Sequence, residues 1–236
     1  MKAILLAAGF GTRLRPLTNT TPKCLVPIND IPLLEWWFRL FEKHGITDVL
    51  INTHYLSDQV RNYIAIHNAS GSKVKAFEFY EKELLGSGGT IAANIDFLQN
   101  DKDFLICYAD NLTNIDLSQL ITNHFLNNPI LTMALFRTTV PEQCGIAKLN
   151  NDHLIIEFVE KPKHPKSNLA NAGIYVASNE IFNYFPKDTN SDFGKDILPK
   201  LVNKMYGFEI HDYLIDVGTP DKYQRAQIEW PLVNKV

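Results

Sequence analysis

Cysteine is scarce in this sequence, with three residues, Cys24, Cys107 and Cys144, spread over a chain of 236. No CxxC pair and no Cys/His set with metal-ligand spacing occurs, which argues against a zinc module and against a disulfide framework. Free cysteine usually behaves as a small buried hydrophobe. We therefore expect three packing residues in a reduced, cytoplasmic protein.

Long apolar runs and strong net charge are also missing. The N-terminal MKAILLAAG is a short apolar run followed by GFGTRLRP instead of a small-residue cleavage site, and no later stretch approaches the ~20 apolar residues of a membrane span. A net charge of -3 argues against a generally basic nucleic-acid-binding surface, although a local site can still be basic. We expect neither nucleic acid nor membrane among the partners.

The chain alternates strand and helix patterns. Lys2–Ala8 is continuously apolar, as in a buried strand, and Leu33–His44 has apolar residues at helical spacing and ends at Gly45. Such a β-α-β rhythm predicts a mostly parallel sheet flanked by helices. The other helices expected are Ser57–His67 with Ser57 as N-cap, Thr90–Leu98, Glu180–Phe185, Ile197–Lys204 and Asp221–Trp230. The other strands expected are Asp48–Asn52, Val74–Tyr80, Phe104–Ala109, Ile130–Arg137, Gly145–Asn150, Leu154–Glu160, Ala172–Val176 and Phe208–Ile215.

A glycine loop, GFGTRL at Gly9–Leu14, follows the first expected strand. It lacks the third glycine of a dinucleotide fingerprint and the GK[ST] of a P-loop. Glycines nevertheless let backbone N–H groups approach an anion, and Arg13 adds a planar fork suited to phosphate oxygens. Lys23 is a second cation nearby in the sequence. The alternative is an ordinary turn with solvated arginines.

Two aspartates each follow an expected buried strand, Asp110 after FLICYA and Asp216 after YLI. Ligands of open α/β sheets bind at the carboxyl ends of strands. Mg²⁺ prefers one or two carboxylates together with phosphate oxygens. The pattern is consistent with a magnesium site, the alternative being two turn or helix-cap aspartates.

The chain resembles the sugar-1-phosphate nucleotidyltransferases in a series of motifs that spans nearly its whole length. The motifs are AAGFGTRLRPLT (7–18), PKCLVP (22–27), ELLGSGGT, ADN, EKP, NAGIY and DVGTP. The resemblance implies one Rossmann-like α/β domain, 1–236, with a nucleotide-binding half, 1–110, and a β-rich sugar-phosphate half, 111–236. Because this sequence continues only briefly after DVGTP, we expect no C-terminal β-helix.

The resemblance also implies site residues. Asp110 and Asp216 would hold the catalytic Mg²⁺, while Arg13 and Lys23 would act on the phosphates of the nucleotide. The loop residues expected at the nucleotide are Ala8, Gly9, Gly11 and Thr12. Those expected at the sugar phosphate are Gly145, Glu160, Lys161 and Asn171.

The stretch YEKELLGSGGT, Tyr80–Thr90, occupies the base-reading loop of that family and looks most like the guanylyltransferases acting on mannose or heptose 1-phosphate. Because guanine presents two adjacent N–H donors, Glu81 or Glu83 could accept both; Gly86 and Ser87 are also expected at the nucleotide. GTP is therefore favoured. Uridylyl, cytidylyl or thymidylyl transfer, an inactive nucleotide-sugar sensor and a homo-oligomeric state all stay open.

Overall fold

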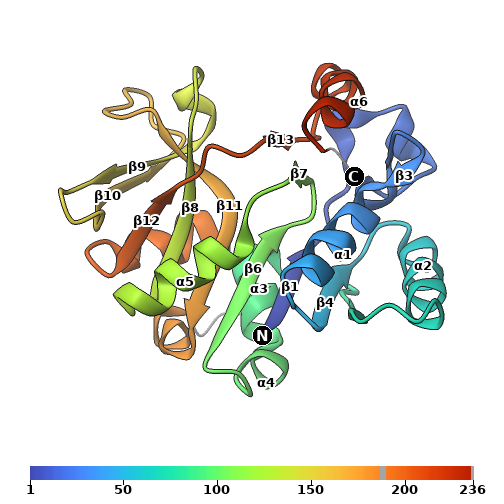
Figure 1. Cartoon of the computed structure of the whole chain (residues 1–236), viewed down its shortest axis with the longest axis horizontal. Coiled ribbons are helices and arrows are strands. Elements are labelled where there is room, and N and C mark those ends of the chain that lie inside the picture. Colours follow the sequence, from blue (N-terminus) through green and yellow to red (C-terminus); the bar gives the residue numbers. More distant parts are fainter. Residues whose placement is uncertain (187–189, 235–236) are drawn as a thin grey trace. The chain divides into compact units, whose positions relative to one another are not determined.

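The structure is a computed structural model that describes residues 1–186 and 190–234. Its backbone divides into two compact units. The first unit comprises Met1–Leu84, Tyr108–Ile115 and Asp212–Val236, and the second comprises Leu85–Cys107 and Asp116–His211. Figure 1 shows the elements of both, coloured along the sequence.

The first unit is built on three parallel strands, β1 (Lys2–Leu6), β4 (Asp48–Thr53) and β5 (Lys75–Tyr80). The near-continuous apolar character of β1 follows from its burial, since Ala3, Ile4 and Leu5 have no exposed surface. Helices α1 (Leu33–Lys43) and α2 (Ser57–Ala69) connect these strands, as the parallel arrangement requires.

Two short antiparallel pairs complete the first unit: β2 (Pro27–Ile28) with β3 (Ile31–Pro32), and β7 (Asn111–Thr113) with β13 (Leu214–Asp216). The second pair joins segments about a hundred residues apart and sets Asp216 opposite Asn111. Helix α6 (Pro220–Val233) begins directly after it, with the Thr219 side chain as N-cap. Helix α6 therefore starts from a strand that is paired with β7.

In the second unit β11 (Leu169–Ser178) is the central strand and pairs antiparallel with β6 (Asp103–Tyr108), β8 (Leu131–Arg137) and β9 (Gly145–Leu149). β10 (Ile155–Glu160) extends β9, and β12 (Met205–Glu209) runs parallel to β8. The helices of this unit are α3 (Gly86–Ala93), α4 (Ile95–Leu98) and α5 (Leu117–Asn127). Shorter helical turns lie at Asn179–Tyr184, Phe193–Ile197 and Leu198–Leu201.

Several expected element boundaries are wrong. Ser57 is the first residue of α2 and not its cap, which is Leu56. The helix expected at 90–98 begins earlier, at Gly86, and is interrupted at Asn94. In place of the helix expected at 197–204, a π-helical turn at Phe193–Ile197 is followed by a 3₁₀ turn at Leu198–Leu201. Pro199 has no backbone N–H and so cannot donate the hydrogen bond that a continuous α-helix needs. The strand expected at 208–215 is two strands, which pair with β8 and β7.

The cysteines are packing residues, as predicted for them. Cys24 and Cys107 are buried, Cys144 is half-buried, and none of the three forms a disulfide. Burial raises the pKa of the Cys24 thiol to about 12. Within the described parts of the chain, no helix is both long enough and apolar enough to cross a bilayer.

Candidate active site

The glycine loop leaves β1 and turns tightly at Gly11. This residue has φ +63°, and its carbonyl accepts hydrogen bonds from the Thr18 hydroxyl over 2.7 Å and from the Leu14 amide over 2.9 Å. A Cβ at position 11 would lie 2.9 Å from Cγ2 of Thr18. Glycine is therefore required here both by the left-handed backbone and by the close approach of Thr18.

Gly9 has a different environment in the same loop. A Cβ built on it would meet no atom within 4 Å, and the residue is exposed. Packing inside the protein therefore does not require glycine at this position. Ala8 before it is buried, whereas Thr12 and Arg13 after it are exposed. The loop thus exposes its backbone at Gly9 and the guanidinium of Arg13, while Ala8 before it is buried.

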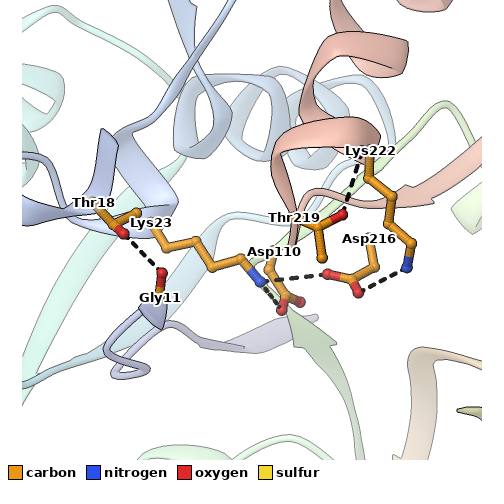
Figure 2. Close-up of polar contacts among 7 residues, drawn as sticks. All are labelled: Gly11, Thr18, Lys23, Asp110, Asp216, Thr219 and Lys222. Carbon is orange, nitrogen blue, oxygen red and sulfur yellow. Dashed lines mark hydrogen bonds and ion pairs between the residues drawn. The ribbon is translucent and has the colours of Figure 1, made fainter. Parts of the chain in front are cut away.

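A cluster of ammonium and carboxylate groups lies in the first unit (Figure 2). Nζ of Lys23 is 2.5 Å from Oδ2 of Asp110 and 3.4 Å from Oδ1 of Asp216. The Lys23 side chain is only 12% exposed, so solvent screens this pairing less than at a surface. The other carboxylate oxygen of Asp216, Oδ2, is 3.2 Å from Nζ of Lys222.

The backbone explains why the two aspartates converge. Asp110 stands directly before β7 and Asp216 ends β13, the partner strand of β7. The carbonyl of Asp110 accepts a hydrogen bond from the Val217 amide over 2.8 Å. Two residues 106 positions apart in the sequence are thus held next to each other by strand pairing.

Arg13 approaches the same carboxylate. A Cβ at Gly218 would lie 2.7 Å from Oδ1 of Asp216 and 3.1 Å from Nη2 of Arg13, so both groups crowd that glycine. Burial by itself would raise the pKa of Asp216, but the charges of Lys23, Lys222 and Arg13 outweigh burial and hold that pKa below its ordinary value. Asp216 is therefore an anion at neutral pH.

The carboxylates of Asp110 and Asp216 fit the ligand set that Mg²⁺ prefers. Both face one ammonium group, so one cation already contacts both side chains. Among residues 1–186 and 190–234 no group of three or more His, Cys, Asp or Glu side chains is arranged as a metal site. A pair of carboxylates suits Mg²⁺ bound mainly by substrate phosphates and water better than a cage made only of protein ligands.

The predicted base-reading glutamates occupy different environments. Glu81 is 3% exposed, and its Oε1 accepts a hydrogen bond from Nδ2 of Asn52 over 2.8 Å. Oδ1 of Asn52 in turn accepts from the Ala7 amide over 2.6 Å. Glu83 is exposed. Of the two side chains, that of Glu83 is the accessible one, while Glu81 supports the strand that leads into the glycine loop.

The predicted sugar-phosphate residues lie in the second unit. Gly145 and Glu160 are directly opposite each other in the β9–β10 pair. A Cβ at Gly145 would lie 2.6 Å from Oε2 of Glu160. Lys161 has φ +49°, its amide donates to the Cys144 carbonyl over 3.0 Å, and its Nζ is 4.0 Å from Oε1 of Glu160. Strand pairing thus brings Gly145, Glu160 and Lys161 together.

Glu160 is partly desolvated at this position. Burial raises the pKa of its carboxyl, and the nearby Asp192 raises it further, while Lys161 and Lys195 oppose both effects. Asn171, on β11, donates from Nδ2 to the Tyr175 hydroxyl over 2.6 Å and accepts from the Gly173 amide over 2.9 Å. Its amide group is therefore held in one orientation by its own strand.

The glycines of the expected base loop lie close to the backbone of Ser191. The carbonyl of Ser191 accepts from the Gly88 amide over 2.8 Å and from the Gly89 amide over 3.2 Å, which caps the start of α3. Gly86 has φ +73°, and a Cβ on it would lie 2.4 Å from that carbonyl. The Ser87 hydroxyl accepts from the Phe193 amide over 2.8 Å. The predicted contacts of Gly86 and Ser87 with a nucleotide remain predictions.

Sequence reasoning missed Lys222, Asn52 and Thr18. Lys222 could have been suspected, because a lysine stands in the first turn after the Thr219–Pro220 helix start, where the helix dipole favours an acid. Asn52 and Thr18 carry no such local signal. Their roles depend on partners 45 and 7 residues away.

Comparison with known proteins identifies the family of this chain. A family model described as nucleotidyl transferase matches residues 2–230. The chain therefore belongs to the nucleotidyl transferase family. This confirms the predicted membership of the sugar-1-phosphate nucleotidyltransferases.

Relatives named for different activities are about equally similar to this chain. It is 34% identical to a D-glycero-alpha-D-manno-heptose 1-phosphate guanylyltransferase of Campylobacter jejuni, covering 94% of this chain and 97% of that protein. It is 32% identical to one of Aneurinibacillus thermoaerophilus, covering 97% and 98%. It is 30% identical to a UTP--glucose-1-phosphate uridylyltransferase of Synechocystis, covering 95% of this chain but 62% of that protein.

Solved structures agree with the fold. A putative glucose-1-phosphate thymidylyltransferase from Bacillus anthracis has a TM-score of 0.85 at 26% identity and covers 100% of this chain and 96% of its own. HddC from Yersinia pseudotuberculosis has a TM-score of 0.80 at 25% identity, covering 97% and 99%. The predicted α/β class, with strands flanked by helices and a β-rich part, is confirmed.

Proposed function

We propose that this protein transfers a nucleotidyl group from a nucleoside triphosphate to a sugar 1-phosphate and releases pyrophosphate. The observation that carries the proposal is the cluster in which Lys23 contacts Asp110 and Asp216 beside Arg13. It combines cations for a polyphosphate with two carboxylates for a divalent ion.

The chemistry needs little beyond positioning and charge. An oxygen of the sugar phosphate attacks the α-phosphorus, and the bond from that phosphorus to the bridging oxygen of pyrophosphate breaks. Because the attacking oxygen is already anionic at neutral pH, no general base is required. Arg13 and Lys23 would neutralise charge that builds up on the phosphates, which is the largest contribution expected for such a reaction.

Asp110 and Asp216 are the residues that would hold Mg²⁺. The ion would supply further charge neutralisation at the phosphate oxygens. Lys23 would keep the two carboxylates close enough to share one ion. Lys23 therefore acts both on the phosphates and on the carboxylate pair.

GTP is the nucleotide we favour, with D-glycero-α-D-manno-heptose 1-phosphate or mannose 1-phosphate as acceptor. Two relatives of nearly equal length are heptose 1-phosphate guanylyltransferases. Glu83 is exposed in the expected base loop, whereas Glu81 is buried, so the Glu83 carboxylate is the one that a base could reach. Glu160, Lys161, Gly145 and Asn171 would contact the sugar phosphate.

The test is a grid of pyrophosphate-release assays with Mg²⁺, crossing GTP, UTP, CTP, dTTP and ATP with sugar 1-phosphates. Release with GTP and a manno-configured sugar phosphate supports the full proposal. Release only with another nucleotide keeps the reaction and overturns the choice of base. Bound nucleotide sugar without release in any cell of the grid would instead favour a sensor. Asp110→Asn serves as the inactive control.

A further inference from the structure

Lys222 occupies a position that is unfavourable for a cation. It lies in the first turn of α6, and its backbone amide donates to Oγ1 of the N-cap Thr219 over 3.4 Å. The positive end of the helix dipole lies at this turn, so an ammonium group there needs a compensating anion. That anion is Asp216, whose Oδ2 is 3.2 Å from Nζ of Lys222 (Figure 2).

Both oxygens of the Asp216 carboxylate therefore face ammonium groups, Oδ1 facing Lys23 and Oδ2 facing Lys222. With Arg13 beside them, three cations surround the two carboxylates, Asp110 and Asp216, an excess of one positive charge. Such an excess disfavours a lone divalent cation, while it favours a polyanion.

The two lysine side chains differ in exposure and in the number of carboxylates they contact. The Lys23 side chain is 12% exposed and contacts both carboxylates, whereas that of Lys222 is 40% exposed and contacts Asp216 alone. Lys222 can thus leave Asp216 for a phosphate oxygen without losing buried contacts. Lys23 cannot do so as readily.

We propose that Lys222 makes divalent-cation binding at Asp110 and Asp216 conditional on a polyphosphate substrate. Without substrate, Lys222 covers Oδ2 of Asp216 and repels the ion. With a polyphosphate present, its ammonium pairs with phosphate oxygens and leaves Oδ2 free for the ion. This inference rests on the proposed nucleotidyl transfer, because it takes the same carboxylates as the ion's ligands.

The proposal requires that one substitution has opposite effects on two ligands. Lys222→Met removes the charge but keeps the length of the chain. We expect it to tighten binding of Mn²⁺ alone about threefold to tenfold, as loss of one partly exposed positive charge near a divalent ion should. We expect it to weaken binding of metal-free pyrophosphate by a similar factor.

Mn²⁺ binding is measured by electron paramagnetic resonance titration and pyrophosphate binding by isothermal titration calorimetry, each on the full-length protein. Lys222→Arg retains the charge and should behave as wild type with both ligands. Lys43→Met removes an exposed lysine of the same unit and should also match wild type. A thermal melt of each variant checks the fold.

Unchanged or weaker Mn²⁺ binding by Lys222→Met overturns the proposal, as does unchanged pyrophosphate binding. So does absence of Mn²⁺ binding in the millimolar range by both wild type and variant. Neither titration requires turnover. If the protein released no pyrophosphate with any nucleotide, the proposed function would be overturned, while the Mn²⁺ and pyrophosphate affinities would still stand. If the enzyme were active but Lys222→Met left both affinities unaltered, only the inference about Lys222 would be overturned.

Discussion

Nδ2 of Asn52 donates a hydrogen bond to Oε1 of Glu81 over 2.8 Å, and the two side chains are 4% and 3% exposed. Because Oδ1 of Asn52 accepts from the Ala7 amide, the orientation of the Asn52 amide group is fixed from both sides. The pairing of β1 with β4 ends at Leu5 and Ile51. Beyond that point the hydrogen bond from the Ala7 amide to the Asn52 side chain links the two segments. The entry to the glycine loop is thereby joined to the end of β5.

The first prediction concerns Glu81. Glu81→Ala should lower the free energy of unfolding by about 1–3 kcal/mol, because Nδ2 of Asn52 would lose this acceptor in a buried place. Glu81→Gln should lower it less, since its amide oxygen can still accept. Urea unfolding measures both.

Glu83→Gln is the matched comparison. It should leave stability unchanged and weaken GTP use more than UTP use, since Glu83 is exposed in the loop expected to read the base. If Glu81→Gln instead selectively impaired GTP use while Glu81→Ala kept full stability, Glu81 would be the base reader.

A second prediction separates the two loop glycines. Gly11→Ala should destabilise the fold by about 1–3 kcal/mol, because alanine would have to adopt a left-handed backbone and displace Thr18. Gly9→Ala should leave the melting temperature unchanged, since its Cβ meets no atom within 4 Å. It should, however, raise the KM for the triphosphate. Equal loss of stability in both variants would contradict this assignment.

Lys23 is the subject of the third prediction. Lys23→Met should reduce kcat by about 10²–10³-fold, the range seen when one preorganised donor to a developing anion is removed. The loss should exceed that of Lys222→Met, because Lys23 contacts both carboxylates. Steady-state kinetics with saturating substrates measure it, and a fall of less than tenfold would argue against a direct role.

The fourth prediction is a pH dependence of stability due to His124. This residue is 1% exposed, with Nδ1 2.9 Å from the Thr132 hydroxyl and Nε2 3.2 Å from Oδ1 of Asp103. Burial lowers the pKa of His124 below its ordinary value, although Asp103 partly opposes this. The unfolded chain therefore takes up a proton at a higher pH than the folded protein does.

Stability should consequently be full above the ordinary histidine pKa and fall as the pH drops from there toward the lowered pKa of the folded state. Urea unfolding at several pH values measures it. His124→Asn should flatten this part of the profile, whereas His164→Gln, at an exposed position, should not. A wild-type profile that rises toward acid pH would contradict the assignment.

Much of the site could be predicted from the sequence because it consists of contiguous motifs. The Ala7–Thr18 loop, Lys23 and the aspartates after two strands are predicted from local patterns, and in the structure Lys23 contacts both aspartates. Their role at a phosphate stays a prediction. The glycines at 86 and 88 were less informative, since a glycine pattern does not reveal whether a ligand or the Ser191 carbonyl requires it.

The sequence alone determined the family, the α/β class and the identities of the principal cations and carboxylates, since all of these are carried by residue type and short spacing. Only the tertiary structure decided that Glu81 is buried against Asn52, that Asp110 and Asp216 meet through the β7–β13 pair, and that Lys222 shares Asp216 with Lys23. The physical reason is common to these features: burial and charge pairing depend on segments far apart in the chain, and their energies exist only once folding has placed those segments side by side.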